Sequence, residues 1–468
     1  MNQSFATPES SPPKLNLAML LALVVGSMIG SGIFNLPQNM AAKAGAGAIL
    51  MGWLITGVGM LLLCSVYQTL AMKKPNLNNG VYAYARAFAG EFIGFNSAWG
   101  YWVSAWLGNV SYLMAMFAAL GYFFPIFGEG NTLPALLGAS LTLWTVHFFI
   151  LRGIKGAAFL NAVITFAKIL PLLFFIIIII PAFQVKIFSF NFWGHTSFFE
   201  QIKSTMLVTV WVFIGIEGAS VYSARAKNRQ DIGKATFIGF GITLLLLMMV
   251  SLLSLGILSQ TELSSLKNLS MASVIDKVIG RTGGMVMVLG LLISAGGALL
   301  AWTLLAAEAL FTPASEQLMP LYFAKENKNH VPTHTLWLTN GLIQIFLVII
   351  LFSKATYLAM ISLATSMILI PYLLSAVYAI QVSKKSGLKE KIIAWLACGY
   401  CCWLLYAAGL KYLFLSALLY MPGAIFYIIA KRQQQKILFK PFEKIIVSII
   451  ILFALTAIGL LSFGKLTI

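Results

Sequence analysis

Charged residues are scarce in this sequence. Only 9% of its 468 residues are Asp, Glu, Lys or Arg, whereas 60% are hydrophobic. A soluble globular domain has about 25% charged residues. The composition therefore excludes an ordinary soluble domain and predicts an all-α polytopic membrane protein, whose apolar spans pack as one unit.

Acidic residues are scarcer than basic ones, with 13 Asp and Glu against 31 Lys and Arg, for a formal net charge of +18. The basic residues are spread over many short loops between apolar runs. Membrane proteins concentrate Lys and Arg in cytoplasmic loops, so the excess needs no nucleic-acid partner, and we expect none.

Cysteines and catalytic motifs are also few. "CGYC" at 398–401 has C-x-x-C spacing, but it lies in a predicted membrane helix without a second ligand pair, so we expect neither a metal nor another cofactor. The sequence has no H-E-x-x-H or G-x-S-x-G, and "GKAT" at 233–236 lacks the glycine spacing of a nucleotide-binding loop. These absences argue against an enzyme and against ATP-driven transport.

Long apolar runs dominate the rest of the chain. The first 14 residues, "MNQSFATPESSPPK", are polar and predict a short disordered cytosolic tail. We predict 13 membrane spans, 12 plus one extra at the C-terminal end, with the break between the eleventh and twelfth resting on "GLK" alone. Their ranges are 17–40, 46–72, 88–124, 133–151, 157–181, 204–224, 233–258, 284–312, 334–352, 355–381, 391–409, 411–431 and 443–463.

The loop charges predict an orientation. With the N-terminus in the cytosol, 21 of the 31 Lys and Arg residues fall in inside loops and 9 in outside loops, and the remaining one, Lys168, lies within a span. This bias favours an N-terminus in the cytosol and supports the span count.

Two spans contain residues that weaken a helix. The stretch "GSMIGSGIF" at 26–34 interrupts the first span, and Gly215 and Gly218 flank Glu217 in the sixth. Transporters built from inverted repeats interrupt a helix at matching positions of both halves. Free N–H and C=O groups at such breaks can bind the carboxylate and ammonium of an amino acid. The alternative is that these glycines only allow close helix packing.

Two stretches carry a resemblance to a known family. "GSMIGSGIFNLPQNMA" and "WVFIGIEGASVYSARAKN" resemble the amino acid–polyamine–organocation (APC) superfamily, and more narrowly its basic amino acid/polyamine antiporters. "FNLPQNMA" and "GIEGAS" favour the arginine/ornithine branch, and the similarity runs across spans 1 to 12.

The resemblance implies a fold and an activity. It implies LeuT-type inverted five-helix repeats with broken helices 1 and 6, and exchange of cationic amino acids by alternating access. The halves would be residues 15–181 (spans 1–5) and 204–381 (spans 6–10), followed by 389–468 with spans 11–13. A bacterial cytoplasmic (inner) membrane is the expected location.

The resemblance also implies a substrate site. "YWVSAWLGN" places a gating Tyr101, a pocket Trp106 and a polar Asn109, while Trp211 and Trp302 match aromatic residues of the family pocket. Aromatic faces attract guanidinium and ammonium groups, although membrane tryptophans also form interfacial belts. Around the two breaks, the expected binding residues are Ser27, Ile29, Gly30, Ser31, Gly32 and Ile214. Ser27 departs from the Asn that family members often have.

Three ionisable residues fall deep within predicted spans, where such groups are costly and point to function. Lys168 resembles a lysine that takes the place of a sodium ion in sodium-independent relatives. Glu217 could counter the substrate charge, respond to pH or govern closure. Glu308, where several arginine/agmatine exchangers have a neutral residue, could face the substrate side chain or the inner vestibule. A static salt bridge among them is the alternative.

Several points stay open at this level. The exchanged pair is not determined, since arginine, ornithine, lysine, agmatine and histidine all fit an aromatic, acid-bearing pocket. A proton-coupled symporter or uniporter of the same fold is the alternative to exchange. A channel would need a continuous polar stripe, which the spans lack. Membrane lipid surrounds the chain, and whether two copies form a homodimer is undecided.

Overall fold

The computed structural model describes residues 16–77, 79–153, 157–217, 227–267, 269–353 and 355–466. Two features named above, the tail at 1–14 and the part of the sixth span that contains Gly218, lie outside the described residues.

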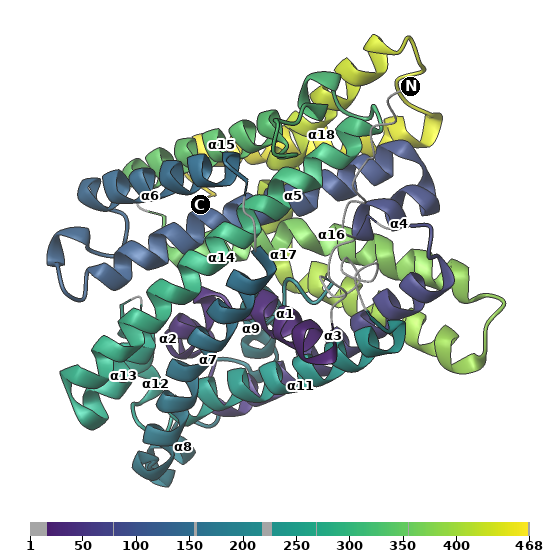
Figure 1. The fold of residues 1–468 in the computed structure, drawn as a ribbon. Coiled ribbons are helices and arrows are strands. Elements are labelled where there is room, and N and C mark those ends of the chain that lie inside the picture. Colours follow the sequence, from purple (N-terminus) through teal and green to yellow (C-terminus); the bar gives the residue numbers. More distant parts are fainter. Residues whose placement is uncertain are drawn as a thin grey trace, which may run out of the picture.

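The described part of the chain is helical throughout and contains no strand, only an isolated bridge between Glu326 and Pro332. Figure 1 shows the arrangement. The elements are α1 (Leu17–Met28), η1 (Ser31–Asn35), α2 (Leu36–Ala41), α3 (Ala46–Lys73), α4 (Gly80–Ala89), α5 (Glu91–Leu120), η2 (Pro125–Phe127), α6 (Leu133–Leu151), α7 (Ala157–Ala182), α8 (Val185–Phe190), α9 (Phe198–Trp211), α11 (Arg229–Ser254), α12 (Gln260–Ser265), α13 (Ser270–Ile279), α14 (Arg281–Ser315), η4 (Leu321–Ala324), α15 (Thr333–Ser353), α16 (Tyr357–Ser383), α17 (Leu388–Gln433) and α18 (Pro441–Ser462).

Most predicted spans are present as helices of membrane length. Among the described residues, nine helices are long and apolar enough to cross a bilayer, and the bent pair formed by α1 with η1 and α2 makes a tenth. The prediction of an all-α polytopic membrane protein is confirmed. The predicted third span starts too early, because Gly90 (φ +92°) separates α4 from α5.

Helix α17 combines the predicted eleventh and twelfth spans. Its 46 residues would extend roughly 70 Å at 1.5 Å per residue, more than twice the thickness of a bilayer core. Gly409 has a left-handed φ of +74° inside it, so two helices meet there. The break predicted at "GLK" is confirmed at this glycine.

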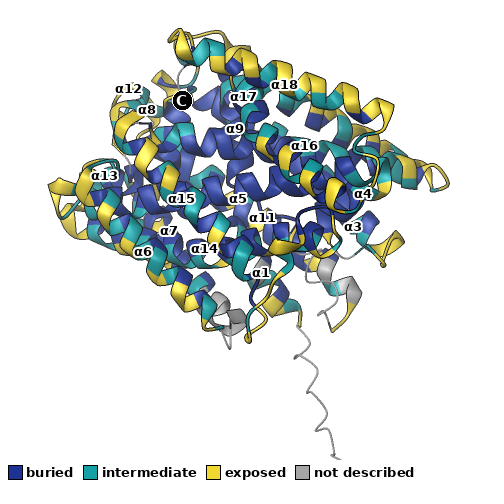
Figure 2. Ribbon diagram, turned by 90° about the horizontal axis from the view of Figure 1, so that it is seen from above, coloured by how far each residue is buried: buried dark blue, intermediate teal, exposed yellow. Residues whose placement is uncertain are grey.

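The buried share of the helices decreases from the centre of the protein outward. In α5, 89% of the most apolar window is buried inside the protein, whereas in α18 only 11% is. Figure 2 shows the buried residues gathered in the middle and α18 along one edge. Helix α5 packs most extensively against α14 and α16. It is therefore the central helix on which a site inside the protein can be built.

Candidate functional site

The first break lies where the sequence loses helix-forming residues. Helix α1 ends at Met28, Ile29 and Gly30 have extended backbone, and the chain resumes as a 3-10 turn, η1, that leads into α2. The two halves are bent by 47°. No side chain caps the N-terminus of η1. The break therefore exposes N–H groups at the start of η1 and C=O groups at the end of α1.

Lys168 binds the carbonyl side of this break. Its ammonium donates hydrogen bonds to the carbonyl oxygens of Gly26 (2.5 Å) and Ile29 (2.6 Å), and its side chain is buried. These partners are backbone groups at the C-terminal end of α1 rather than a carboxylate. The lysine on α7 thus satisfies two of the carbonyls that the interrupted helix leaves without intrahelical donors.

The second break follows α9. Beyond Trp211 the backbone forms turns through Glu217, and Gly215 adopts a φ of +109° that side chains rarely tolerate. The Glu217 carboxylate accepts hydrogen bonds from the Gly215 N–H (3.2 Å) and the Tyr372 hydroxyl (2.8 Å), and it also interacts with Tyr101. It therefore ties this break to α16 and α5.

The two breaks contact each other through Ser27. Its hydroxyl donates to the carbonyl oxygens of Val24 (2.8 Å) and Gly215 (3.1 Å), which joins α1 to the turn after α9. A Cβ at Gly215 would lie 2.9 Å from the Ser27 carbonyl oxygen. The close approach thus requires glycine at this position, and two segments 188 residues apart form one structural unit.

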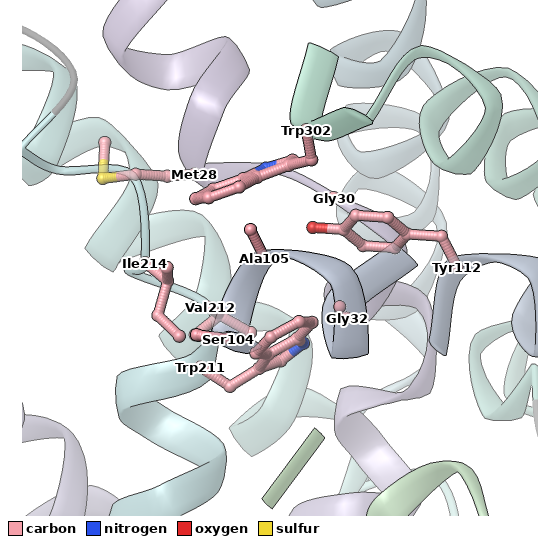
Figure 3. A pocket seen from close by; sticks show the side chains of 11 residues that line it. Met28, Gly30, Gly32, Ser104, Ala105, Tyr112, Trp211, Val212, Ile214 and Trp302 are labelled. Carbon is pink, nitrogen blue, oxygen red and sulfur yellow. The ribbon is translucent and has the colours of Figure 1, made fainter. Parts of the chain in front are cut away.

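A small cavity lies beside the two breaks. In Figure 3, Trp302 and Trp211 stand on opposite sides of it, with Ala105 between them. The lining residues are all uncharged. They are Met28, Gly30, Gly32, Ser104, Ala105, Gly108, Tyr112, Trp211, Val212, Ile214 and Trp302.

Glycines make room for the aromatic walls. A Cβ at Gly32 or Gly108 would lie 2.9 Å from the Trp211 ring, which therefore packs between them. Trp211 is 6.1 Å from Tyr112 between ring centroids, and Trp302 is 6.2 Å from Tyr101. Two aromatic pairs thus flank a space that no charged side chain lines. The aromatic faces suit a flat or cationic group.

Five of the residues expected from the sequence line this cavity, namely Gly30, Gly32, Trp211, Ile214 and Trp302. Three others lie directly behind it. Ser27 and Ile29 hold the first break as described, and the Ser31 hydroxyl is 3.4 Å from the Tyr357 hydroxyl.

The structure places the other expected binding residues away from the cavity wall. Trp106 packs against Trp102 and Phe346, with centroid separations of 6.2 and 4.7 Å. Asn109 donates to the Thr303 hydroxyl (3.1 Å) and so joins α5 to α14.

Glu308 does not line the cavity either. It is exposed on α14 and has no ion pair with any described residue.

Sequence reasoning missed four residues of α5 that line the cavity. Ser104, Ala105, Gly108 and Tyr112 follow helical spacing and share one face with Tyr101, which was expected. The small residues at three of these positions were the available signal. Position 106 is rotated away from this face, which is why Trp106 lies elsewhere.

A segment between α11 and α14 packs against the wall formed by η1 and α2. The Gln38 N–H donates to the Ser270 hydroxyl (3.1 Å), and the Asn35 side chain accepts from the Leu269 N–H. At its far end the Tyr122 hydroxyl donates to both Asp276 carboxylate oxygens (3.0 Å each). Burial and this carboxylate raise the pKa of Tyr122 to about 12. The segment α12–α13 thus links the first break to the end of α5.

Comparison with known proteins places this arrangement in a family. The sequence profile described as "Amino acid permease" matches residues 15–455. The chain belongs to the amino acid permease family. The predicted resemblance to the APC superfamily is therefore confirmed.

Individual relatives of this permease cover nearly all of it. It is 52% identical to an arginine/ornithine antiporter of Pseudomonas aeruginosa, over 98% of this chain and 100% of that protein. It is 44% identical to a putative arginine/ornithine antiporter of Escherichia coli (90% and 92%). It is 42% identical to an arginine/agmatine antiporter of Chlamydia felis (96% of each).

Proposed function

We propose that this protein is a secondary active transporter that exchanges cationic amino acids, of the arginine/ornithine type, across a bacterial cytoplasmic membrane by alternating access. The observation that carries the proposal is the cavity between two interrupted helices with Trp211 and Trp302 on opposite sides. The names of the relatives, all antiporters of arginine with a second amine, support the same substrate class.

The site offers different groups to the two ends of a substrate. The exposed backbone at Gly30–Gly32 suits an α-carboxylate, because N–H groups at the start of a helical turn attract anions. The ring of Trp302 suits a guanidinium or ammonium, since a cation over an aromatic face gains about 0.5–2 kcal/mol. The uncharged lining favours recognition of the cation by aromatic rings rather than by a carboxylate.

Residues around the cavity have supporting roles in this proposal. Lys168 takes the place of a coupling sodium ion, because its ammonium already occupies the carbonyls of the first break. Tyr101, with Glu217 and its partner Tyr372, forms a closure on one side of the cavity. Asn109 holds the cavity wall on α5 against α14. Glu308, which is exposed, lies on the path of the substrate outside the cavity.

The same proposal includes the organisation of the chain. We assign residues 15–181 and 204–381 to two inverted repeats and 389–468 to the added spans. The interruptions after Met28 and Trp211 lie at corresponding places of these halves. The charge bias of the loops supports a cytosolic N-terminus.

Counterflow in proteoliposomes tests this function. Vesicles preloaded with ornithine should take up labelled arginine, and vesicles without an internal cationic amino acid should take up little. Uptake should be the same in sodium and in potassium buffers, because Lys168 fills the ion's place. Equal uptake by empty vesicles, or uptake that follows an imposed proton gradient without internal substrate, would replace exchange by uniport or symport.

A further inference from the structure

The loop between α16 and α17 carries an excess of positive charge. Residues 384–391 read "KKSGLKEK", so four lysines accompany one glutamate. This glutamate, Glu390, forms an ion pair with Lys73 at the end of α3, and Lys73 also donates to the Ser386 hydroxyl. Three lysines are exposed and form no ion pair with any described residue, and we call them the loop lysines: Lys384, Lys385 and Lys389.

Basic side chains at other helix ends have acidic partners. Arg86 forms ion pairs with Glu91 and Glu316, and Lys431 also pairs with Glu91. The charge bias of membrane proteins accounts for basic residues in inside loops. It does not require that several of them lie together in one short loop without an acid to neutralise them. The loop lysines therefore produce a local positive field that attracts anions from outside the protein.

Helix α17 continues from this loop with an exposed apolar face. Its residues follow the spacing of one side of a helix, and we call them the α17 stripe: Leu388, Ile392, Trp395 and Leu396. In a membrane-spanning chain, an exposed apolar face contacts lipid acyl chains, and tryptophan is frequent where the chains meet the headgroups. The loop lysines lie at the start of this stripe, so they are at the level of the headgroups.

We propose that the loop lysines bind the headgroup of an anionic phospholipid whose acyl chains pack along the α17 stripe. The ammonium groups of the lysines complement the phosphate charge, and each lysine near an anionic membrane surface strengthens binding about fivefold. With the orientation proposed above, this lipid belongs to the cytoplasmic leaflet. The site lies outside the cavity lining, so the inference does not depend on the identity of the substrate.

A phospholipid fits this surface better than a soluble anion does. A soluble phosphate would meet only the loop lysines, whose attraction salt screens. A lipid has chains that cover the α17 stripe as well, and removal of apolar surface from water and detergent adds to the binding. The combination of unpaired lysines and an uncovered apolar stripe on one helix end therefore favours a ligand with both a charged and an apolar part.

The test is thermal unfolding of purified full-length protein in dodecyl maltoside micelles. Added palmitoyl-oleoyl phosphatidylglycerol should raise the unfolding temperature, because it binds the folded protein, and phosphatidylcholine with the same chains should raise it less. The triple variant Lys384→Gln, Lys385→Gln, Lys389→Gln should need at least about tenfold more phosphatidylglycerol for the same rise. The corresponding triple arginine variant keeps the charge and should respond as the wild type does.

The matched control removes the same charge from three exposed lysines at separate places, with Lys186→Gln, Lys267→Gln and Lys277→Gln in one protein. It should keep the wild-type response to phosphatidylglycerol. An equal loss in the two triple glutamine variants would show that the lipid follows net charge alone, and it would overturn the inference. An unchanged response of the loop variant would also overturn it, as would equal stabilisation of the wild type by glycerol phosphate, which has the charge but no acyl chains.

Discussion

At the scale of single residues, the cavity proposed to bind a cationic substrate has no acidic side chain in its lining. The cavity is lined by uncharged residues, and the Glu217 carboxylate accepts hydrogen bonds from Gly215 and Tyr372. A cation in the cavity would therefore meet aromatic faces rather than a carboxylate. In the proposed function, this arrangement separates recognition of the cation, at Trp302, from the hydrogen bonds that hold the second break.

Trp302→Ala should weaken binding of arginine by about 1–3 kcal/mol, because it removes both the aromatic face and its apolar contact area. Trp302→Phe should lose less. The measurement is an isothermal titration with purified protein. Trp395→Ala is the control, since Trp395 is 64% exposed on α17, far from the cavity lining. Wild-type affinity in the Trp302→Ala protein would place this ring outside the binding site.

Glu217→Gln and Tyr372→Phe should each slow exchange while leaving arginine binding measurable, because both weaken one contact between the second break and α16. Their effects should not add: the double variant should be about as slow as the slower single variant, as expected for partners in one hydrogen bond. Initial rates of counterflow provide the comparison. Additive losses would mean that the two side chains act separately.

At the scale of elements, the two interrupted helices differ in how strictly they require glycine. Gly215 combines a φ of +109° with a backbone oxygen 2.9 Å from its missing Cβ, so both strain and contact exclude a side chain. Gly30 differs, because its φ of −110° suits any residue and only the Tyr112 side chain limits it. A side chain would therefore be strained at the second break but not at the first.

Gly215→Ala should lower the melting temperature and strongly reduce exchange, because the turn after α9 must separate from Ser27. Gly241→Ala on α11 is the matched control, since nothing lies within 4 Å of its added Cβ and alanine favours a helix. Thermal unfolding and counterflow are measured on both. A Gly215→Ala protein as stable and active as the Gly241→Ala protein would show that the turn relaxes without cost.

At the scale of the whole molecule, the helices differ in how much of their surface is buried inside the protein. Helix α5 is enclosed by α14, α16 and α4, whereas α18 packs mainly against α17 and is largely uncovered by protein. Phe439, just before α18, is partly buried and packs against the core through Phe92 and Tyr427. The boundary between the central unit and the added helix therefore follows Lys440.

Removal of residues 441–468 should leave counterflow within a fewfold of the intact protein and lower its thermal stability modestly. The reason is that α18 contributes no residue to the cavity and little buried area. A matched truncation before Phe439 should be more damaging, since it also removes the contacts with Phe92 and Tyr427. Complete loss of exchange on removing α18 alone would show that it supports the transport cycle.

The sequence alone predicted most of the spans, the interruption at 26–34, the break near Gly409 and the family. These follow from long apolar runs and from glycines, whose effects are local. It also indicated that Lys168 matters, because a charge inside a span is costly. Its partners, two carbonyls on another helix, are a tertiary fact.

Only the tertiary structure decided which face of each helix meets the cavity. In a soluble helix the alternation of polar and apolar residues reveals the buried face, but α5 is buried on all sides and apolar around its circumference. The residue pattern therefore did not show that Trp106, the expected lining residue, lies away from the cavity. Packing against α14 and α16 sets the rotation of α5, and that rotation sends Trp106 to Phe346 and Ser104 to the cavity.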